Sequence, residues 1–185
     1  MQFVSELWAP ILIATALCFV LSALFWTALP YHTKERRRLP TEQRMLDALR
    51  HDAPPPGLYA FPFVMGGDVN RPDIRAALHK GPVGFVTITA NGPASMAKRL
   101  AHTMVFHLSV TTLTAYVAWQ SLKLGSAYLD VFRVVGVVTA MTYGLGMTPE
   151  SIWFGRPWKS WTFTLLDSGF YATVTAGVFG WLWPT

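Results

Sequence analysis

The run from Trp8 to Leu29 constrains this chain most, because it contains no charged side chain. A helix rises about 1.5 Å per residue, so this run reaches about 33 Å and is long enough to cross a hydrocarbon core of about 30 Å. A cleaved signal peptide is the competing interpretation, and it requires a basic region before a shorter apolar stretch. Residues 1–7 contain Glu6 and neither Lys nor Arg. We therefore interpret the run as a membrane span that is retained.

The composition excludes several classes of protein. Hydrophobic residues make up 52% of the 185 residues and charged residues only 14%, against about 25% charged residues in soluble domains. A lone cysteine, Cys18, excludes an intramolecular disulfide framework and a zinc site built on cysteine spacing. The net charge is +5, but the basic residues lie beside apolar runs and form no separate basic domain, so we expect membrane lipids and not nucleic acid as partners.

Further apolar runs of spanning length cover residues 103–122, 128–147 and 162–183. They are continuous and do not alternate, which favours helices over barrel strands. We therefore predict an all-α membrane protein: a bundle of four transmembrane helices with a small α+β cytoplasmic segment between helices 1 and 2. The predicted regions are residues 1–30 (first span), 31–101 (cytoplasmic segment) and 102–185 (the other three spans).

The distribution of Lys and Arg predicts the orientation, because cytoplasmic loops of membrane proteins are enriched in them. One side of the predicted bundle carries Lys34 and a basic set that we expect to contact lipid headgroups or a partner: Arg36, Arg37, Arg38, Lys98, Arg99, Arg156 and Lys159. The other side carries only Lys123 and Arg133. We therefore expect a multi-pass protein of the bacterial inner membrane with both termini in the periplasm.

The segment between the first two spans is too polar and too interrupted to cross. Periodicity predicts a short helix over 41–50, and a proline in the first turn predicts another over 72–80. Extended backbone is expected over 58–65, and a strand rich in Val, Thr, Ile and Phe over 83–90. The prolines and glycine of residues 53–57 separate the first helix from the first extended stretch.

Small residues recur every fourth position on two of the predicted spans, and such stripes let helix backbones approach in lipid. We expect the two stripes to face each other in an antiparallel pair. They consist of Gly136, Ala140 and Gly144 on the third span, and of Ser168, Ala172, Ala176 and Gly180 on the fourth.

Two ionisable residues at membrane depth, His107 and Asp167, are candidates for function. Their matching depths from the same side predict that they meet in the bundle interior, with Thr111 and Tyr171 continuing the polar face. One interpretation is a proton relay or ligand site. The other, which we favour because the opposite half of the spans lacks a polar chain, is a structural hydrogen bond that fixes helix register.

No residues with the spacing of a catalytic or metal site are found, so we predict no catalytic residue and no metal, and we favour a protein that is not an enzyme. No cofactor is expected. A haem held by His32 and His102 from two different helices is the alternative, although both would lie at the membrane surface.

Several stretches resemble a family of small bacterial inner-membrane proteins. They are Leu39-Pro40-Thr41-Glu42, residues 55–62 (PPGLYAFP), residues 81–84 (GPVG), residues 152–158 (IWFGRPW) and residues 179–184 (FGWLWP). The first and last spans are more loosely similar to DUF1761-type membrane proteins. These resemblances imply a bacterial inner membrane, and they imply no activity, cofactor or catalytic residue.

Together these patterns predict a non-enzymatic accessory subunit or oligomeric scaffold, associated with another membrane protein or with copies of itself. A protomer of a small transporter or proton-conducting channel, using the His107 and Asp167 face, is the first alternative. A redox membrane subunit that binds haem or quinone is the second.

Overall fold

The computed structural model describes residues 2–185, and the chain forms two compact units. The first unit contains the chain up to Arg36 together with residues 95–151 and 156–185. The second contains residues 37–94 and 152–155. The chain is mostly helical with one small sheet, so the coarse fold class predicted from the sequence is confirmed.

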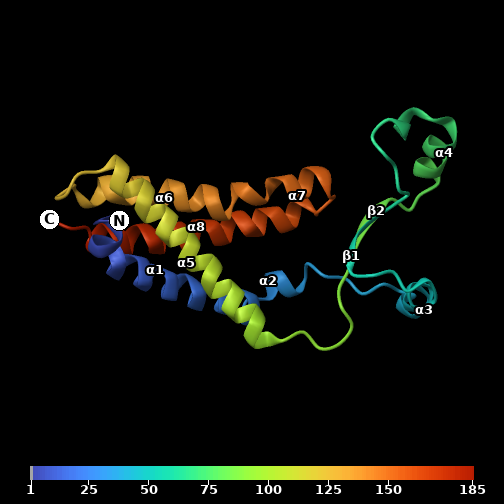
Figure 1. The fold of residues 1–185 in the computed structure, drawn as a ribbon, viewed down its shortest axis with the longest axis horizontal. Coiled ribbons are helices and arrows are strands. Elements are labelled where there is room, and N and C mark those ends of the chain that lie inside the picture. The colour runs from blue at the N-terminus through green and yellow to red at the C-terminus, as the bar shows by residue number, and fades with distance from the viewer. Residues whose placement is uncertain (1) are drawn as a thin grey trace. The chain divides into compact units, whose positions relative to one another are not determined.

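Long helices make up the first unit (Figure 1). They are α1 (Gln2–Thr27), α5 (Met96–Ser121), α6 (Tyr128–Tyr143) and α8 (Trp158–Trp181). Shorter elements are α2 (Pro30–Thr33), the 3-10 turn η2 (Leu145–Met147) and α7 (Thr148–Trp153), of which residues 148–151 belong to this unit. Helix α1 packs against α5 and α8, α5 packs against α6, and α6 packs along α8, so the long helices close a ring.

Two clusters of buried side chains show that successive long helices run antiparallel. One cluster joins Leu7 and Val131, near the starts of α1 and α6, to Ala118 and Phe179, near the ends of α5 and α8. The other cluster contains Phe25 near the end of α1 and Tyr143 at the end of α6, and we call this end of the bundle the Tyr143 end. The chain therefore goes up and down through the bundle, and its two termini lie at the same end (Figure 1).

The helix boundaries depart from the apolar runs in two ways. Helices α1 and α5 begin at Gln2 and Met96, well before the runs at residues 8 and 103, because polar residues continue a helix without adding hydropathy. The run over 128–147 is not one helix: α6 ends at Tyr143, and η2 and α7 follow. Glycine is a poor helix former, and Gly144 stands at this break as the C-cap of α6.

The second unit contains the short elements expected between the first two spans. They are α3 (Glu42–Asp52), β1 (Gly57–Phe61), the 3-10 turn η1 (Asp68–Asn70), α4 (Pro72–Lys80) and β2 (Gly84–Ile88). Strands β1 and β2 pair antiparallel, with Gly57 opposite Ile88 and Phe61 opposite Gly84. The expected helices and extended stretches are confirmed within a few residues at each end. None of residues 37–94 is buried, so this part has no apolar core of its own.

Two helical stretches among the described residues are long and apolar enough to cross a membrane: Gln2–Thr27 and Tyr128–Trp153. Only 33% and 28% of their most apolar windows are buried, whereas the core helix of a soluble protein is mostly buried. Helices α5 and α8 have 26 and 24 residues, which is also a spanning length, but they are more polar.

Candidate functional site

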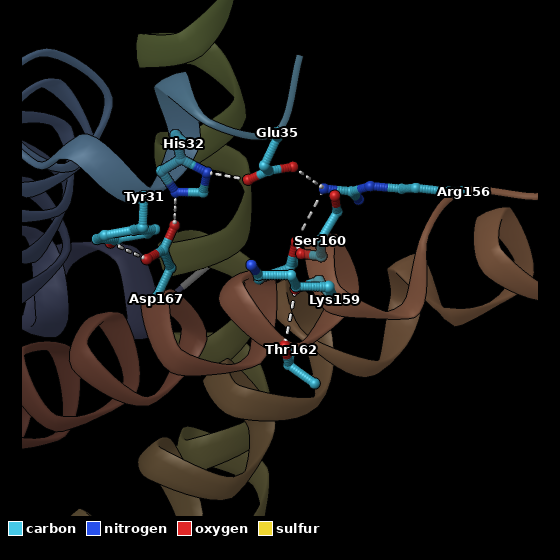
Figure 2. A network of polar contacts seen from close by, with 9 residues as sticks. Tyr31, His32, Glu35, Arg156, Lys159, Ser160, Thr162 and Asp167 are labelled. Atoms are coloured by element: carbon cyan, nitrogen blue, oxygen red, sulfur yellow. Dashed lines mark hydrogen bonds and ion pairs between the residues drawn. The ribbon is translucent and has the colours of Figure 1, made fainter. Parts of the chain in front are cut away.

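The carboxylate of Asp167 joins two helices that are far apart in the sequence (Figure 2). Asp167 lies on α8 and is only 5% exposed. Its Oδ1 accepts a hydrogen bond from the Tyr31 hydroxyl at 2.6 Å, and its Oδ2 lies 2.8 Å from His32 Nε2. Tyr31 and His32 both belong to α2, so the carboxylate fastens this four-residue helix to the bundle.

The imidazole of His32 is 3% exposed and contacts a carboxylate through each ring nitrogen. Nε2 faces Asp167, and Nδ1 lies 2.5 Å from Glu35 Oε1. The ring stacks on Trp26 with 4.1 Å between ring centroids and 2° between planes. A buried ion pair is tolerated only when its members are well hydrogen-bonded, and both bonding positions of this ring are used.

Glu35 extends the polar chain to the residues that precede α8. Its Oε2 lies 3.9 Å from Arg156 Nη2, and the same Arg156 nitrogen donates to Thr164 Oγ1 at 3.1 Å. Figure 2 shows the resulting row of side chains, Asp167, His32, Glu35 and Arg156. We call these residues, with Tyr31, the His32 network.

Tyr31 acts in this network as a hydrogen-bond donor. Burial, followed by its hydrogen bond to Asp167 and the negative charges of Asp167 and Glu35, raises the pKa of the Tyr31 hydroxyl well above its ordinary value. The phenol therefore keeps its proton in neutral solution and occupies one oxygen of Asp167.

The predicted pairing of His107 with Asp167 is wrong, because each residue has a different partner. His107 Nδ1 bonds the Tyr143 hydroxyl at 2.7 Å, while both oxygens of Asp167 are taken by Tyr31 and His32. Tyr171 lies one turn after Asp167 and packs its ring edge-to-face against His107, at 5.7 Å between centroids. The two candidates thus belong to one polar region without touching through a hydrogen bond.

Polar side chains continue from His107 to the middle of the bundle. Thr111 lies one turn further along α5, and its hydroxyl bonds that of Thr15 on α1 at 2.7 Å. Cys18 Sγ lies 3.4 Å from the Thr175 hydroxyl on α8. Beyond this level the buried cluster around Leu7 and Phe179 is apolar. The polar interior therefore extends from the Tyr143 end to about mid-bundle and stops there.

Some buried polar atoms in the described part of the chain have no hydrogen-bond partner: His107 Nε2 and the hydroxyls of Thr114, Thr139 and Ser151. We expect Thr139→Val to leave the free energy of unfolding unchanged or to raise it by about 1 kcal/mol, because it removes a hydroxyl that bonds nothing. Thr15→Val should lower it by about 1 kcal/mol, because it breaks the bond to Thr111. Denaturant titration of both variants in micelles checks this, and a larger loss for Thr139→Val would contradict it.

The structure brings together parts of the two small-residue stripes. A Cβ at Gly136 would lie 3.6 Å from Ala176 Cβ, and one at Gly144 would lie 2.7 Å from Ser168 Oγ. Gly180 instead meets the ring of Tyr128. Ala140 and Ala172 have another environment: with Gly136 and Arg133 they line a shallow groove of about 320 Å³ on the outside of α6 and α8.

The basic set predicted to contact lipid or a partner divides in two. Arg36, Arg37, Lys98, Arg99 and Lys159 are exposed. Arg38 forms an exposed ion pair with Glu42 at 2.9 Å, and Arg156 is half-buried in the His32 network. Arg156 is therefore chiefly an internal partner of Glu35.

Haem ligation by His32 and His102 would require His32 to give up one of its two carboxylate contacts. His102 is exposed on α5. Among residues 2–185 no group of three or more His, Cys, Asp or Glu side chains is arranged to hold a metal ion.

Sequence reasoning missed Tyr31 and Glu35 as members of a buried network. Comparisons of the chain with family models, with curated proteins and with solved structures give no match. The resemblance drawn from the tryptophan-rich stretches therefore stays a prediction, and arguments about function depend on geometry alone.

Proposed function

We propose that this protein is an integral membrane protein whose four long helices all cross the bilayer, and that it serves as a non-enzymatic accessory subunit or oligomeric scaffold. The proposal that the bundle lies in a membrane depends on where its apolar side chains are found: large apolar side chains cover the outside, and many smaller or hydroxyl-bearing ones lie inside. Water-soluble bundles bury their large apolar side chains, whereas helices in lipid pack through small and hydroxyl-bearing residues.

The bundle interior contains many small and hydroxylic side chains beside the apolar cluster around Leu7 and Phe179, and its exterior is apolar on each long helix. The buried positions include Ala14, Thr111, Ala115, Thr139, Thr175 and Ala176. The exposed positions include Leu12, Leu17 and Val20 on α1, Val105, Phe106 and Leu113 on α5, Leu129, Val137 and Met141 on α6, and Leu166 and Phe170 on α8. An apolar surface of this extent is unfavourable in water and is expected against acyl chains.

The higher polarity of α5 and α8 is compatible with crossing the membrane. A hydropathy value treats each hydroxyl as if it had no hydrogen-bond partner within the protein. Several hydroxyls of these helices, however, donate to carbonyl oxygens of their own helix. On α5, Ser109 bonds the carbonyl of Val105 at 2.8 Å, and on α8, Thr173 bonds that of Gly169 at 2.8 Å. Moving a hydrogen-bonded hydroxyl from water into lipid costs much less free energy than moving an unbonded one.

Insertion and topology have a direct test with single cysteines in a Cys18→Ala background. A cysteine at Lys123, in the loop between α5 and α6, should react with a membrane-impermeant maleimide on intact spheroplasts. A cysteine at Lys80, on α4, should react only after permeabilisation. The protein should also stay in the membrane after alkaline carbonate extraction. Labelling of both positions from the same side would contradict the four-span proposal.

The accessory role is supported by the groove on α6 and α8, where Gly136, Ala140 and Ala172 leave room for another helix. Purification in a mild detergent should therefore yield a complex larger than the monomer. Ala140→Leu, which fills the groove, should dissociate the complex. Leu113→Val, on the exposed face of α5, should leave it intact. A wild-type protein that elutes as a monomer without a partner would overturn the accessory role.

A protomer of a proton-conducting assembly is the second candidate, and the polar interior favours it. Charged and hydroxylic side chains extend from the His32 network past His107 to Thr175. The apolar cluster around Leu7 and Phe179 closes the other end, so conduction would require this cluster to open. Proteoliposomes with an internal pH dye test this candidate, and uptake no faster than in protein-free vesicles would exclude it.

A further inference from the structure

We propose that His32, Asp167 and Glu35 together form a proton-binding site, and that the bound proton fastens α2 to α8. This inference goes beyond the proposed membrane role and does not depend on any partner subunit.

A neutral His32 ring has too few hydrogens for the two contacts that it makes. His32 presents Nδ1 to Glu35 and Nε2 to Asp167, at 2.5 and 2.8 Å. A carboxylate oxygen only accepts, and a neutral imidazole carries a hydrogen on one nitrogen alone. Both contacts exist together only when the three groups share one further proton, either as an imidazolium or as one protonated carboxyl. The proton belongs to the cluster as a whole, because its members titrate together.

The charges of the cluster balance only when this further proton is bound. With the proton bound, Asp167, Glu35, His32 and Arg156 sum to zero, counting two negative and two positive charges. Without it the buried cluster carries one net negative charge, which is costly where solvent is excluded. His32 is 3% exposed and Asp167 is 5% exposed. Neutrality of the cluster therefore favours the bound proton.

Several groups face His32 from the elements packed against α2. Helix α1 contributes the Trp26 ring, and α8 contributes Asp167 and the Phe163 ring. The chain around α2 contributes Tyr31 and Glu35, and the segment before α8 contributes Arg156 through Glu35. Tyr31 already donates to Asp167. Within the part of the chain that the structure describes, the acceptors that face the two ring nitrogens of His32 are thus the carboxylates of Asp167 and Glu35.

The consequence concerns the position of α2. This helix has four residues, too few to be stable by itself. Loss of the proton leaves an imidazole lone pair facing an oxygen of Asp167 or of Glu35, and that one contact breaks, while Tyr31 still donates to Asp167. Raising the pH should therefore loosen α2 on α8, although the Tyr31 hydrogen bond to Asp167 remains, and lowering the pH should restore both His32 contacts.

Two measurements on the full-length protein in micelles test the proposal between about pH 5 and pH 9. The first is ring ¹⁵N NMR of histidine-labelled protein, with the His32 resonance assigned by its absence in His32→Gln. The second is the distance distribution between spin labels attached to the cysteines of Lys34→Cys and Lys123→Cys, in a Cys18→Ala background. We expect the His32 ring to lose its proton as the pH rises and the label distribution to broaden over the same range.

A set of variants distinguishes the effect of losing the bound proton from the effect of losing folded structure. Asp167→Asn keeps the shape and removes one charge, so the affinity of the site for the proton should fall roughly tenfold. His32→Gln should give a label distribution that does not change with pH. His51→Gln, an exposed histidine beside Asp52, is the matched control and should behave as wild type. A His32 ring that shows no titration in this range, or one that titrates while the label distances stay constant, would overturn the proposal.

Discussion

Asp167→Ala should lower the free energy of unfolding by about 3–5 kcal/mol, the usual cost of removing one member of a buried ion pair. The carboxylate is 5% exposed and accepts from Tyr31 and His32. Its removal leaves a buried hydroxyl and a buried imidazole nitrogen without their acceptor. Because both partners lie on α2, the loss also detaches this helix from α8.

Urea titration in mixed micelles, followed by circular dichroism, measures this change. A matched control is Asp130→Ala, which removes an exposed carboxylate paired with Arg133 at 3.4 Å and should cost less than about 1 kcal/mol. The combination of Asp167→Leu with His32→Phe should recover much of the lost stability, because it removes both members of the buried contact. If the two alanine variants lowered the free energy of unfolding equally, the His32 network would contribute no more stability than an exposed ion pair.

The helices and the sheet were largely predictable because each depends on local sequence. Apolar runs of spanning length marked the positions of the long helices, and residues 53–57 marked the end of α3. The break after Tyr143 was not predictable from hydropathy, because the residues around Gly144 are as apolar as the helix before them. Four-residue helix α2 was missed for the opposite reason, since it is too short to show a period.

The candidate site was only half predictable. A carboxylate at membrane depth made Asp167 a candidate, and the structure does bury it. Its partner His32 is 135 residues earlier in the chain, and its place just after the first span predicted a solvated side chain. The chain instead begins α2 at Pro30 and lays this short helix against α8. Such a contact depends on tertiary packing and leaves no local pattern.

Gly180→Val should lower the free energy of unfolding by about 1–3 kcal/mol, the usual cost of overpacking a tight contact. A Cβ at this position would lie 2.7 Å from two ring carbons of Tyr128, with the Tyr128 carbonyl oxygen 3.3 Å away. Turning the ring aside relieves the contact only in part, because the carbonyl oxygen belongs to the backbone of α6, so α6 and α8 must also shift slightly apart. The close approach of these helices is what the small residue permits.

Gly169→Ala is the matched control on the same helix, since nothing lies within 4 Å of a Cβ at that position. It should raise stability by about 0.5–1 kcal/mol, because alanine loses less backbone entropy in a helix than glycine. Thermal unfolding in micelles should therefore move in opposite directions for the two variants. If Gly180→Val were as stable as wild type, the contact between Tyr128 and α8 would be loose, and the small-residue stripe would not set the helix spacing there.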